Sequence, residues 1–297
     1  MKFTTQATLC AAIVLSFAAG LSAEPWKIDI GTNLTTGVNS YSNNWEGGEA
    51  GSFSWAAQFL GVAEKQFSNP VNSKTSLKLQ FGQTATQDKT SKSWSVPQKS
   101  TDLIDGEELL RLILNAWVDP FISVRAISGF LDESDSLLVR YMNPVEITEA
   151  AGVSRTLQKN ENVEWATRIG VAARQLVDRH HLDTATGIRA TNLTNDGGFE
   201  FDMDLKAANK EKWVSYLSSF RIYEALLSSK ADEFKGTSAE KDWRYPHVKW
   251  ENTLTLTFAK YLMLNLSAYL YYDKDIHRDV RLKETLSAGL TYTYSKK

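Results

Sequence analysis

The most constraining feature of this sequence is an alternation of apolar and polar side chains that continues through most of the chain. It is sharpest in residues 199–206, where Phe, Phe, Met and Leu alternate with Glu, Asp, Asp and Lys. Side chains two residues apart share one face of a β-strand, whereas a helix repeats after about 3.6 residues. One face of this strand is therefore charged and the other apolar, which predicts that the two faces meet very different surroundings.

The same period recurs in runs that predict about twelve β-strands. The segment from Glu107 to Trp117 is rich in leucine and also suits a helix. Its neighbours favour a strand, with Asp119-Pro120 as a tight reversal after it. The alternation is weakest in 144–157. The predicted strands are 25–40, 51–66, 73–86, 107–118, 121–131, 144–157, 162–177, 197–208, 212–225, 246–259, 261–274 and 280–294.

The connections between these strands are alternately long and short. The long ones are 41–50, 87–106, 132–143, 178–196 and 226–245, with a smaller one at 275–279; the short ones lie near 67–72, 119–120, 158–161, 209–211 and Lys260. Short turns at one end and long loops at the other are typical of bacterial outer-membrane barrels, whereas a β-sandwich has Greek-key crossings. We therefore expect an all-β fold, a transmembrane antiparallel up-and-down β-barrel of about 12 strands. Its termini would be periplasmic and its long loops extracellular.

Aromatic residues near the strand ends fit this interpretation. In lipid every backbone amide must be paired, which requires a closed sheet, and Trp and Tyr rings are best placed at the headgroup level. Outer-membrane lipid is thus an expected partner. The candidates for these aromatic belts are Trp26, Trp55, Trp117, Trp165, Trp213, Trp250, Tyr261, Tyr272, Tyr292 and Tyr294.

The N-terminus has the pattern of a secretory signal peptide. Lys2 precedes a short apolar core, Leu9 to Phe17, and a run of small residues follows it. We expect a signal peptide over 1–23 and a barrel domain over 24–297, with cleavage after Ala23 or, alternatively, after Gly20. Lys and Arg number 33 against 35 Asp and Glu. This near balance argues against nucleic acid as a partner.

The end of the last strand matches an assembly signal. Ser287, Gly289, Tyr292 and Tyr294 fill the pattern polar-x-Gly-x-x-aromatic-x-aromatic, which resembles the signal by which outer-membrane barrels engage their assembly machinery. That machinery is a predicted partner. The chain continues for three residues beyond the last aromatic, where many such barrels stop.

Four stretches also resemble a known family. The chain is similar there to an outer-membrane family catalogued as domain-of-unknown-function family 3078, most clearly in its C-terminal third. The resemblance implies a barrel in the outer membrane and supplies no catalytic residues. The stretches are NNWEGGE (Asn43 to Glu49), YMNPVEIT (Tyr141 to Thr148), VKWENTLTLTFAKYL (Val248 to Leu262) and YYDKDI (Tyr271 to Ile276).

Charged residues on the inward face form the candidate site. Arg174 and Arg221 are predicted to face Glu200 and Asp202 from the two adjacent strands. Such a cluster would either act as a charged constriction that selects small solutes or plug the interior with salt bridges. About eight strands leave an interior that side chains fill, whereas about sixteen leave a channel. Twelve strands lie between these cases, so both interpretations remain open.

We expect no catalytic, cofactor or metal residues. His180, His181 and Asp183 form a histidine cluster that suits a surface metal site, but solvated loop residues are the simpler interpretation. Asp242, His247, Asp273, Asp275 and His277 are expected at a hydrophilic rim. The favoured function is a narrow channel for small solutes. The alternatives are a closed barrel that binds through its loops or supports the envelope, an outer-membrane hydrolase, and a soluble periplasmic β-protein.

Overall fold

The structure is a computed structural model that describes residues 25–42, 50–135, 137–182, 187–237 and 240–296. The predicted signal peptide, the segment NNWEGGE and Asp183 therefore lie outside the described residues. Of the described residues, none belongs to a helix that is both long and apolar enough to cross a membrane.

The fold is a closed barrel of twelve antiparallel strands that follow one another in chain order, and β1 closes the sheet on β14. This confirms the predicted all-β up-and-down barrel. The barrel strands are β1 (Lys27–Asn39), β2 (Ser52–Gln66), β3 (Val71–Thr86), β4 (Gln98–Leu112), β5 (Asp119–Ser128), β8 (Val145–Lys159), β9 (Val163–Leu182), β10 (Arg189–Ala208), β11 (Val214–Ser228), β12 (His247–Phe258), β13 (Leu262–Asp273) and β14 (His277–Lys296).

The remaining elements lie in two connections. Strands β6 (Leu131–Asp132) and β7 (Arg140–Tyr141) pair with each other between β5 and β8. Helix α2 (Lys230–Glu233) and the 3₁₀ turn η2 (Asp242–Arg244) lie between β11 and β12. Both connections are among the predicted long loops, and both contain local structure that the sequence pattern did not indicate.

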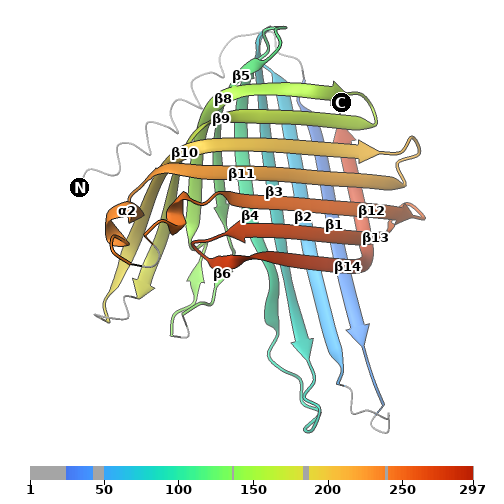
Figure 1. Cartoon of the computed structure of the whole chain (residues 1–297). Coiled ribbons are helices and arrows are strands. Elements are labelled where there is room, and N and C mark those ends of the chain that lie inside the picture. The colour runs from blue at the N-terminus through green and yellow to red at the C-terminus, as the bar shows by residue number, and fades with distance from the viewer. Residues whose placement is uncertain (1–24, 43–49, 136, 183–186, 238–239, 297) are drawn as a thin grey trace.

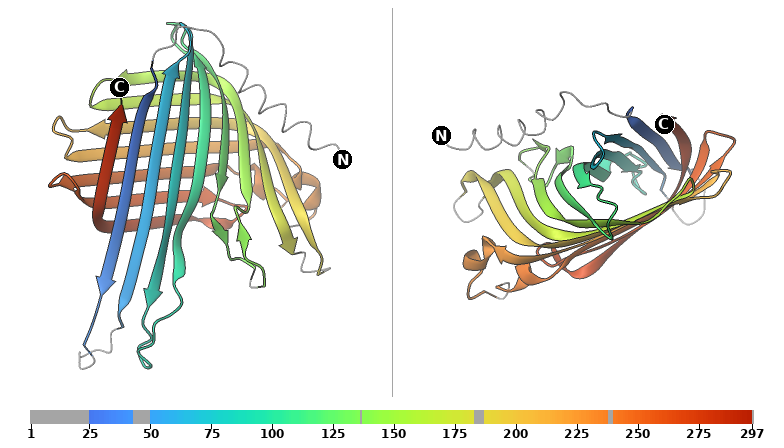
Figure 2. Two further views of the ribbon diagram at one scale, coloured as in Figure 1. Left: turned by 180° about the vertical axis from the view of Figure 1, so that it is seen from behind. Right: turned by 90° about the horizontal axis from the view of Figure 1, so that it is seen from above.

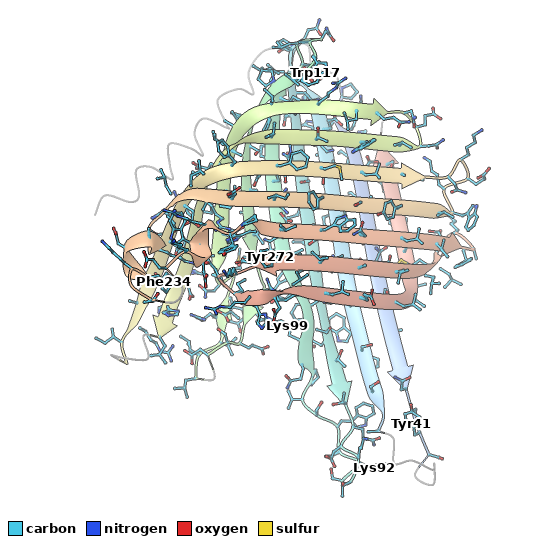
Figure 3. All side chains as sticks on the ribbon, viewed as in Figure 1. Tyr41, Lys92, Lys99, Trp117, Phe234 and Tyr272 are labelled. Carbon is cyan, nitrogen blue, oxygen red and sulfur yellow. The ribbon has the colours of Figure 1, made fainter. Side chains whose placement is uncertain are left out.

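The two ends of the barrel differ. The strands of β8–β14 run crosswise to those of β1–β4 on the opposite wall, as strongly tilted strands do in a barrel (Figure 1). We call one end the turn end: it carries the short connections, the start of β1 and the end of β14 (Figure 2). The opposite end carries the long connections, and we call it the loop end. Tyr41 and Lys92 lie at the far tips of the loop end (Figure 3).

Three predicted boundaries are wrong. Asp119 and Pro120 begin β5 instead of forming the turn, which lies at 113–118, where Asn115 takes a φ of 53° and Asp119 accepts a hydrogen bond from the Leu114 amide at 3.0 Å. Strand β4 begins at residue 98, inside the predicted loop 87–106. The predicted loop 178–196 is mostly a hairpin, because polar residues there continue the pairing of β9 with β10.

Ion pairs between strands that are not neighbours identify the inward face. Lys78 of β3 contacts Glu251 of β12 at 2.6 Å, and Lys74 of β3 contacts Glu164 of β9 at 3.2 Å. These strands are far apart in the strand order, so both contacts cross the interior. Because successive side chains of a strand point to opposite faces, these contacts show which of the other residues in each strand are inward and which are outward.

The exterior is apolar and the interior polar, the reverse of a soluble protein. Outward positions carry exposed apolar side chains, such as Leu34 (52 %), Ile169 (56 %) and Leu286 (68 %). Inward positions carry buried polar groups, such as Arg168 (7 %) and Asp202 (3 %). This distribution matches a wall with lipid outside and a wetter interior.

Aromatic side chains collect at the turn end. Trp117 lies at the tip of the turn between β4 and β5 (Figure 3) and is 75 % exposed. The others are on the first or last residues of strands or in turns, as an aromatic belt requires. The exposed members at this end are Trp26, Trp117, Trp165, Trp213, Tyr261, Tyr292 and Tyr294.

Candidate functional site

The interior is crossed by two ion pairs, which we call the cross-lumen pairs: Lys78–Glu251 near the middle of their strands and Lys74–Glu164 nearer the turn end. Glu251 also accepts a hydrogen bond from the Tyr271 hydroxyl at 2.5 Å. The side chains of the cross-lumen pairs are between 24 % and 36 % exposed. Water therefore reaches them, although they narrow the interior.

A second group of charges fills the side of the interior next to β4, β9 and β10. Arg168 contacts Glu107 at 2.7 Å and Asp202 at 3.3 Å, and Arg125 contacts Asp105 at 2.5 Å. These charges are well buried, and Arg168 also lies over the ring of Phe121. This half of the interior is a packed network, in contrast to the partly exposed cross-lumen pairs.

The predicted cluster lies beside this network, and its pairing differs in part from the expectation. Arg221 contacts Asp202, its register partner on β10. Arg174 instead pairs with Asp196 at 2.7 Å, with Glu146 3.9 Å away. The cause is the predicted loop 178–196, which is largely strand: β9 runs to Leu182 and β10 begins at Arg189, so the register partner of Arg174 is Asp196 and that of Glu200 is Gly170.

Arg174, Glu200 and Arg221 nevertheless line one small cavity of about 20 Å³, together with Tyr223 and His247. The Tyr223 hydroxyl and His247 Nε2 are buried there without a hydrogen-bond partner. A volume of this size suits about one water molecule. At the predicted cluster the interior is therefore nearly filled.

A much larger cavity of about 470 Å³ lies at the loop end, and we call it the mouth cavity. It is lined by residues of β3, β4, β13 and β14 and by the connection between β5 and β8. Lys99, at the loop end in Figure 3, lines this cavity and pairs with Asp102 at 2.8 Å. Lys283 of β14 donates a hydrogen bond across the cavity to the Ser100 carbonyl at 3.0 Å.

The connection between β5 and β8 forms an ordered cap at the loop end. Arg140 contacts Asp132 at 2.6 Å and Asp178 of β9 at 3.0 Å. Burial alone would raise the pKa of Asp132, but hydrogen bonds from Ser134 and Asn143 outweigh it and hold the pKa below its usual value. We define the cap as residues 129–144.

A further ion pair joins the cap to β10. Asp135 contacts Arg189, and the hydrogen bond from that guanidinium, aided by the Leu137 amide, lowers the pKa of Asp135 to about 2. The cap is thus attached to the β9–β10 hairpin by charged contacts that persist at neutral pH.

Three of the described histidines contact aspartates at the loop end, whereas His180 contributes its backbone carbonyl to Arg189. His181 contacts Asp178 at 2.8 Å, and His277 lies 3.9 Å from Asp279. His247, Asp273 and Asp275 are close enough to share a metal ion. Arg174 is already 2.9 Å from His247 Nδ1, and Lys230 is 2.8 Å from Asp275. Two cations in these positions oppose a third, so we assign no metal to this group.

The predicted assembly-signal residues lie on both faces of β14. Tyr292 and Tyr294 are outward and exposed at the turn end, and Ser287 and Gly289 are inward. A Cβ added at Gly289 would lie 2.1 Å from the Leu34 carbonyl oxygen of β1. This glycine therefore has a role in closing the barrel in addition to any role in recognition.

Sequence reasoning missed the cross-lumen pairs. Their partners are 90 and 173 residues apart, and no local pattern joins them. The one available signal was the position of Lys74, Lys78, Glu164 and Glu251 on inward faces, which the alternation did indicate. Which of them meet depends on the tilt and stagger of the closed barrel.

Comparison with known proteins gives structural similarity alone. Neither a protein-family model nor a curated protein sequence matches the chain. The COG4313 outer membrane channel from Pseudomonas putida F1 is 13 % identical, with 94 % of this chain and 97 % of that chain covered and a TM-score of 0.43. The translocator domain of the autotransporter NalP from Neisseria meningitidis is 8 % identical, with coverage of 98 % and 95 % and a TM-score of 0.36. Pseudomonas putida OprB is 8 % identical, with 97 % of this chain and 96 % of that chain covered and a TM-score of 0.28. At these scores the likeness adds nothing to what the strand pairing establishes.

Proposed function

We propose that this protein is a bacterial outer-membrane barrel that provides a narrow passage for small solutes, with the loop end outside the cell. The observation that supports it is the apolar exterior around a charged interior. Single exposed apolar residues are common on soluble proteins, but here they occupy the outward positions of strand after strand. Outer-membrane lipid would be the partner of this surface, and the assembly machinery would recognise the end of β14.

The uneven filling of the interior favours a passage along one wall. The network around Arg168 and Asp202 is buried, whereas inward residues on β2 and β14 stay exposed. Leu60 shares the inward face with Lys78, its register partner, and is 38 % exposed. Inward positions of β1 include Gly31, which has no atom within 4 Å of an added Cβ. The passage would follow this wall and be narrowest at the cross-lumen pairs.

Single-channel recording in planar bilayers tests the proposal. The folded protein should give a small, reproducible conductance, since the cross-lumen pairs restrict the path. The double variant Lys78→Gln/Glu251→Gln removes both charges of one pair without changing the net charge, and it should raise the conductance. The matched control is Lys230→Gln/Asp275→Asn, an ion pair of the loop end. Absence of conductance in the folded wild type and in the widened variant would refute the passage.

The ordered loop end favours a second candidate, a closed barrel that binds a partner through its loops. Trp243 of η2 is 6 % exposed and packs against Tyr223 and Ala225, which face the interior. Together with the cap, it covers part of the loop end. If conductance is absent, this candidate would be tested by deleting the cap and measuring surface binding and envelope integrity.

We propose no catalytic role. A serine–histidine hydrolase needs a histidine within hydrogen-bond reach of its nucleophile. His181, His247 and His277 instead contact aspartates, and His247 also contacts Arg174. Lipid and peptide turnover assays test this proposal, and activity abolished by changing a loop-end carboxylate would contradict it.

A further inference from the structure

β1 and β14 are hydrogen-bonded along only the turn-end part of β14. Their pairing runs from Ile28↔Lys296 to Thr36↔Ala288, whereas β14 stays paired with β13 as far as Arg281 and beyond a register shift to His277. Among the described residues, the segment 277–287 therefore has a partner strand on one side alone. The two strands diverge there, with β14 running crosswise while β1 continues toward the loop end (Figures 1 and 2). We call this place the seam.

Side chains at the seam are exposed on both faces. Lys283 and Thr285 share the inward face with Tyr269, the register partner of Lys283, yet both are exposed. The outward side chains on both edges are apolar: Val38 of β1 is 64 % exposed and Leu286 of β14 is 68 % exposed.

An unpaired strand edge at membrane depth is tolerated only where it is buried in protein or lines a water-filled space. Glu284 gives an independent indication of water. It is an exposed outward residue between Leu282 and Leu286, and a carboxylate in apolar surroundings is costly without hydration. The seam therefore borders a wet opening in the wall.

The mouth cavity lies directly behind this opening. Lys283 belongs to the seam and also lines the cavity. β14 and β13, which lie on one side of the seam, contribute lining residues to the cavity. On the other side the lining comes from β3 and β4, which follow β1 and β2 in the strand order, and β1 and β2 contribute none. Its volume of about 470 Å³ falls in the range of small-molecule sites, about 300–1,000 Å³.

Among the described residues that line the mouth cavity, one cation has no acidic partner. Lys99 is paired with Asp102, and Asp132 is paired with Arg140. The described contact of Lys283 is a backbone carbonyl, which does not neutralise its charge. A ligand that enters from the side would meet apolar strand edges first and this ammonium group next.

We propose that the seam is a side entrance for a single-chain amphiphile with an acidic head group. The head would pair with Lys283, and the tail would lie along the apolar edges of β1 and β14. This inference rests on the proposed function and names its substrate class and route. The ligand class follows from the ammonium group of Lys283, which has no acidic partner among the described residues, behind an apolar entrance.

Binding of dodecanoate to the protein in lipid nanodiscs tests the ligand class. Lys283→Gln should weaken dodecanoate binding about tenfold, because a hydrogen bond to a charged group is lost, and should leave dodecanol binding unchanged. The control is Lys249→Gln, an inward lysine of the small cavity, which should alter neither. Equal dodecanoate binding by Lys283→Gln and wild type would overturn the assignment. So would stronger binding of dodecyltrimethylammonium than of dodecanoate, which would indicate that Glu284 dominates.

A cysteine pair tests the opening itself. Asn39→Cys/Thr285→Cys places thiols at the register pair three positions beyond Thr36↔Ala288 if the pairing of β1 and β14 continued, and these thiols should stay reduced. Asn33→Cys/Thr291→Cys, in the paired part, should form a disulfide. Equal oxidation of both cysteine pairs would show that β1 and β14 stay paired along the seam and would refute the entrance.

Joining the first pair with a short bismaleimide should slow dodecanoate uptake at least tenfold and leave salt conductance intact. Unchanged uptake would refute the side route alone. Absence of salt conductance in the unlinked protein would refute the proposed passage, whatever the dodecanoate result.

Discussion

Leu34 and Asn33 are neighbours on β1, but their side chains meet opposite surroundings. Leu34 is outward and 52 % exposed, whereas Asn33 is inward and donates a hydrogen bond to Gln58 at 3.3 Å. In a membrane barrel the cost of a charge therefore depends on which of two adjacent positions carries it.

We expect Leu34→Arg to lower the free energy of unfolding by about 2–4 kcal/mol, the cost of an outward arginine near the membrane midplane. Asn33→Arg should be much better tolerated, because Gly31 beside it leaves space. Urea titration of both variants in detergent or lipid vesicles measures the difference. Equal losses would mean that the assigned facing is wrong.

At the scale of the element, closure of the barrel depends on how closely β14 approaches β1. Gly289 has no room for a Cβ beside Leu34, whereas Gly31 on the partner strand has open space around it. The alternation predicted both strands, and it placed Gly289 in an assembly signal. It gave no indication of the steric role, because the contact joins the first and last strands of the chain.

Gly289→Ala should therefore lower the free energy of unfolding by about 1–3 kcal/mol through overpacking. Gly31→Ala should be neutral or stabilising by about 0.4–1 kcal/mol. Refolding both variants into detergent without the assembly machinery separates packing from recognition. If Gly289→Ala refolds with wild-type stability, the glycine serves recognition alone.

The cap gives a prediction for pH. The pKa of Asp135 in the folded protein is lowered to about 2, below the value of about 3.9 in an unfolded chain. The ion pair with Arg189 thus stabilises the docked cap above about pH 4, and that stabilisation is lost as pH falls toward 2.

A nitroxide on Leu137→Cys, a cap position that is 82 % exposed, should stay immobile from pH 7 to about pH 4 and become mobile below. With Arg189→Gln added, the label should already be mobile at pH 7. Loosening of the label already between pH 7 and 5 would contradict control by Asp135.

For the whole molecule, the two-residue alternation of apolar and polar side chains predicted the strands. The lengths between these strands then predicted the alternation of short turns and long loops. Both can be predicted because they depend on residues that are close together in the sequence. The end of β4 and the start of β5 were placed wrongly, because Asn115 makes the turn before Asp119 is reached. The cross-lumen pairs, the seam and the mouth cavity could not be predicted, because they depend on barrel tilt and on register shifts. Arg221 pairs with its expected partner Asp202, whereas Arg174 pairs with Asp196, because β9 and β10 extend into the predicted loop 178–196.

The fold and the proposed function depend on one physical arrangement, an apolar outer wall that requires lipid and encloses a charged interior. The most direct measurement is circular dichroism, together with heat-modifiable gel mobility, of residues 24–297 diluted from urea into buffer alone or into lipid vesicles. We predict β-rich, heat-modifiable protein in vesicles and no folded soluble species in buffer. A stable, folded monomer in buffer without any amphiphile would contradict the membrane barrel and the functions proposed from it.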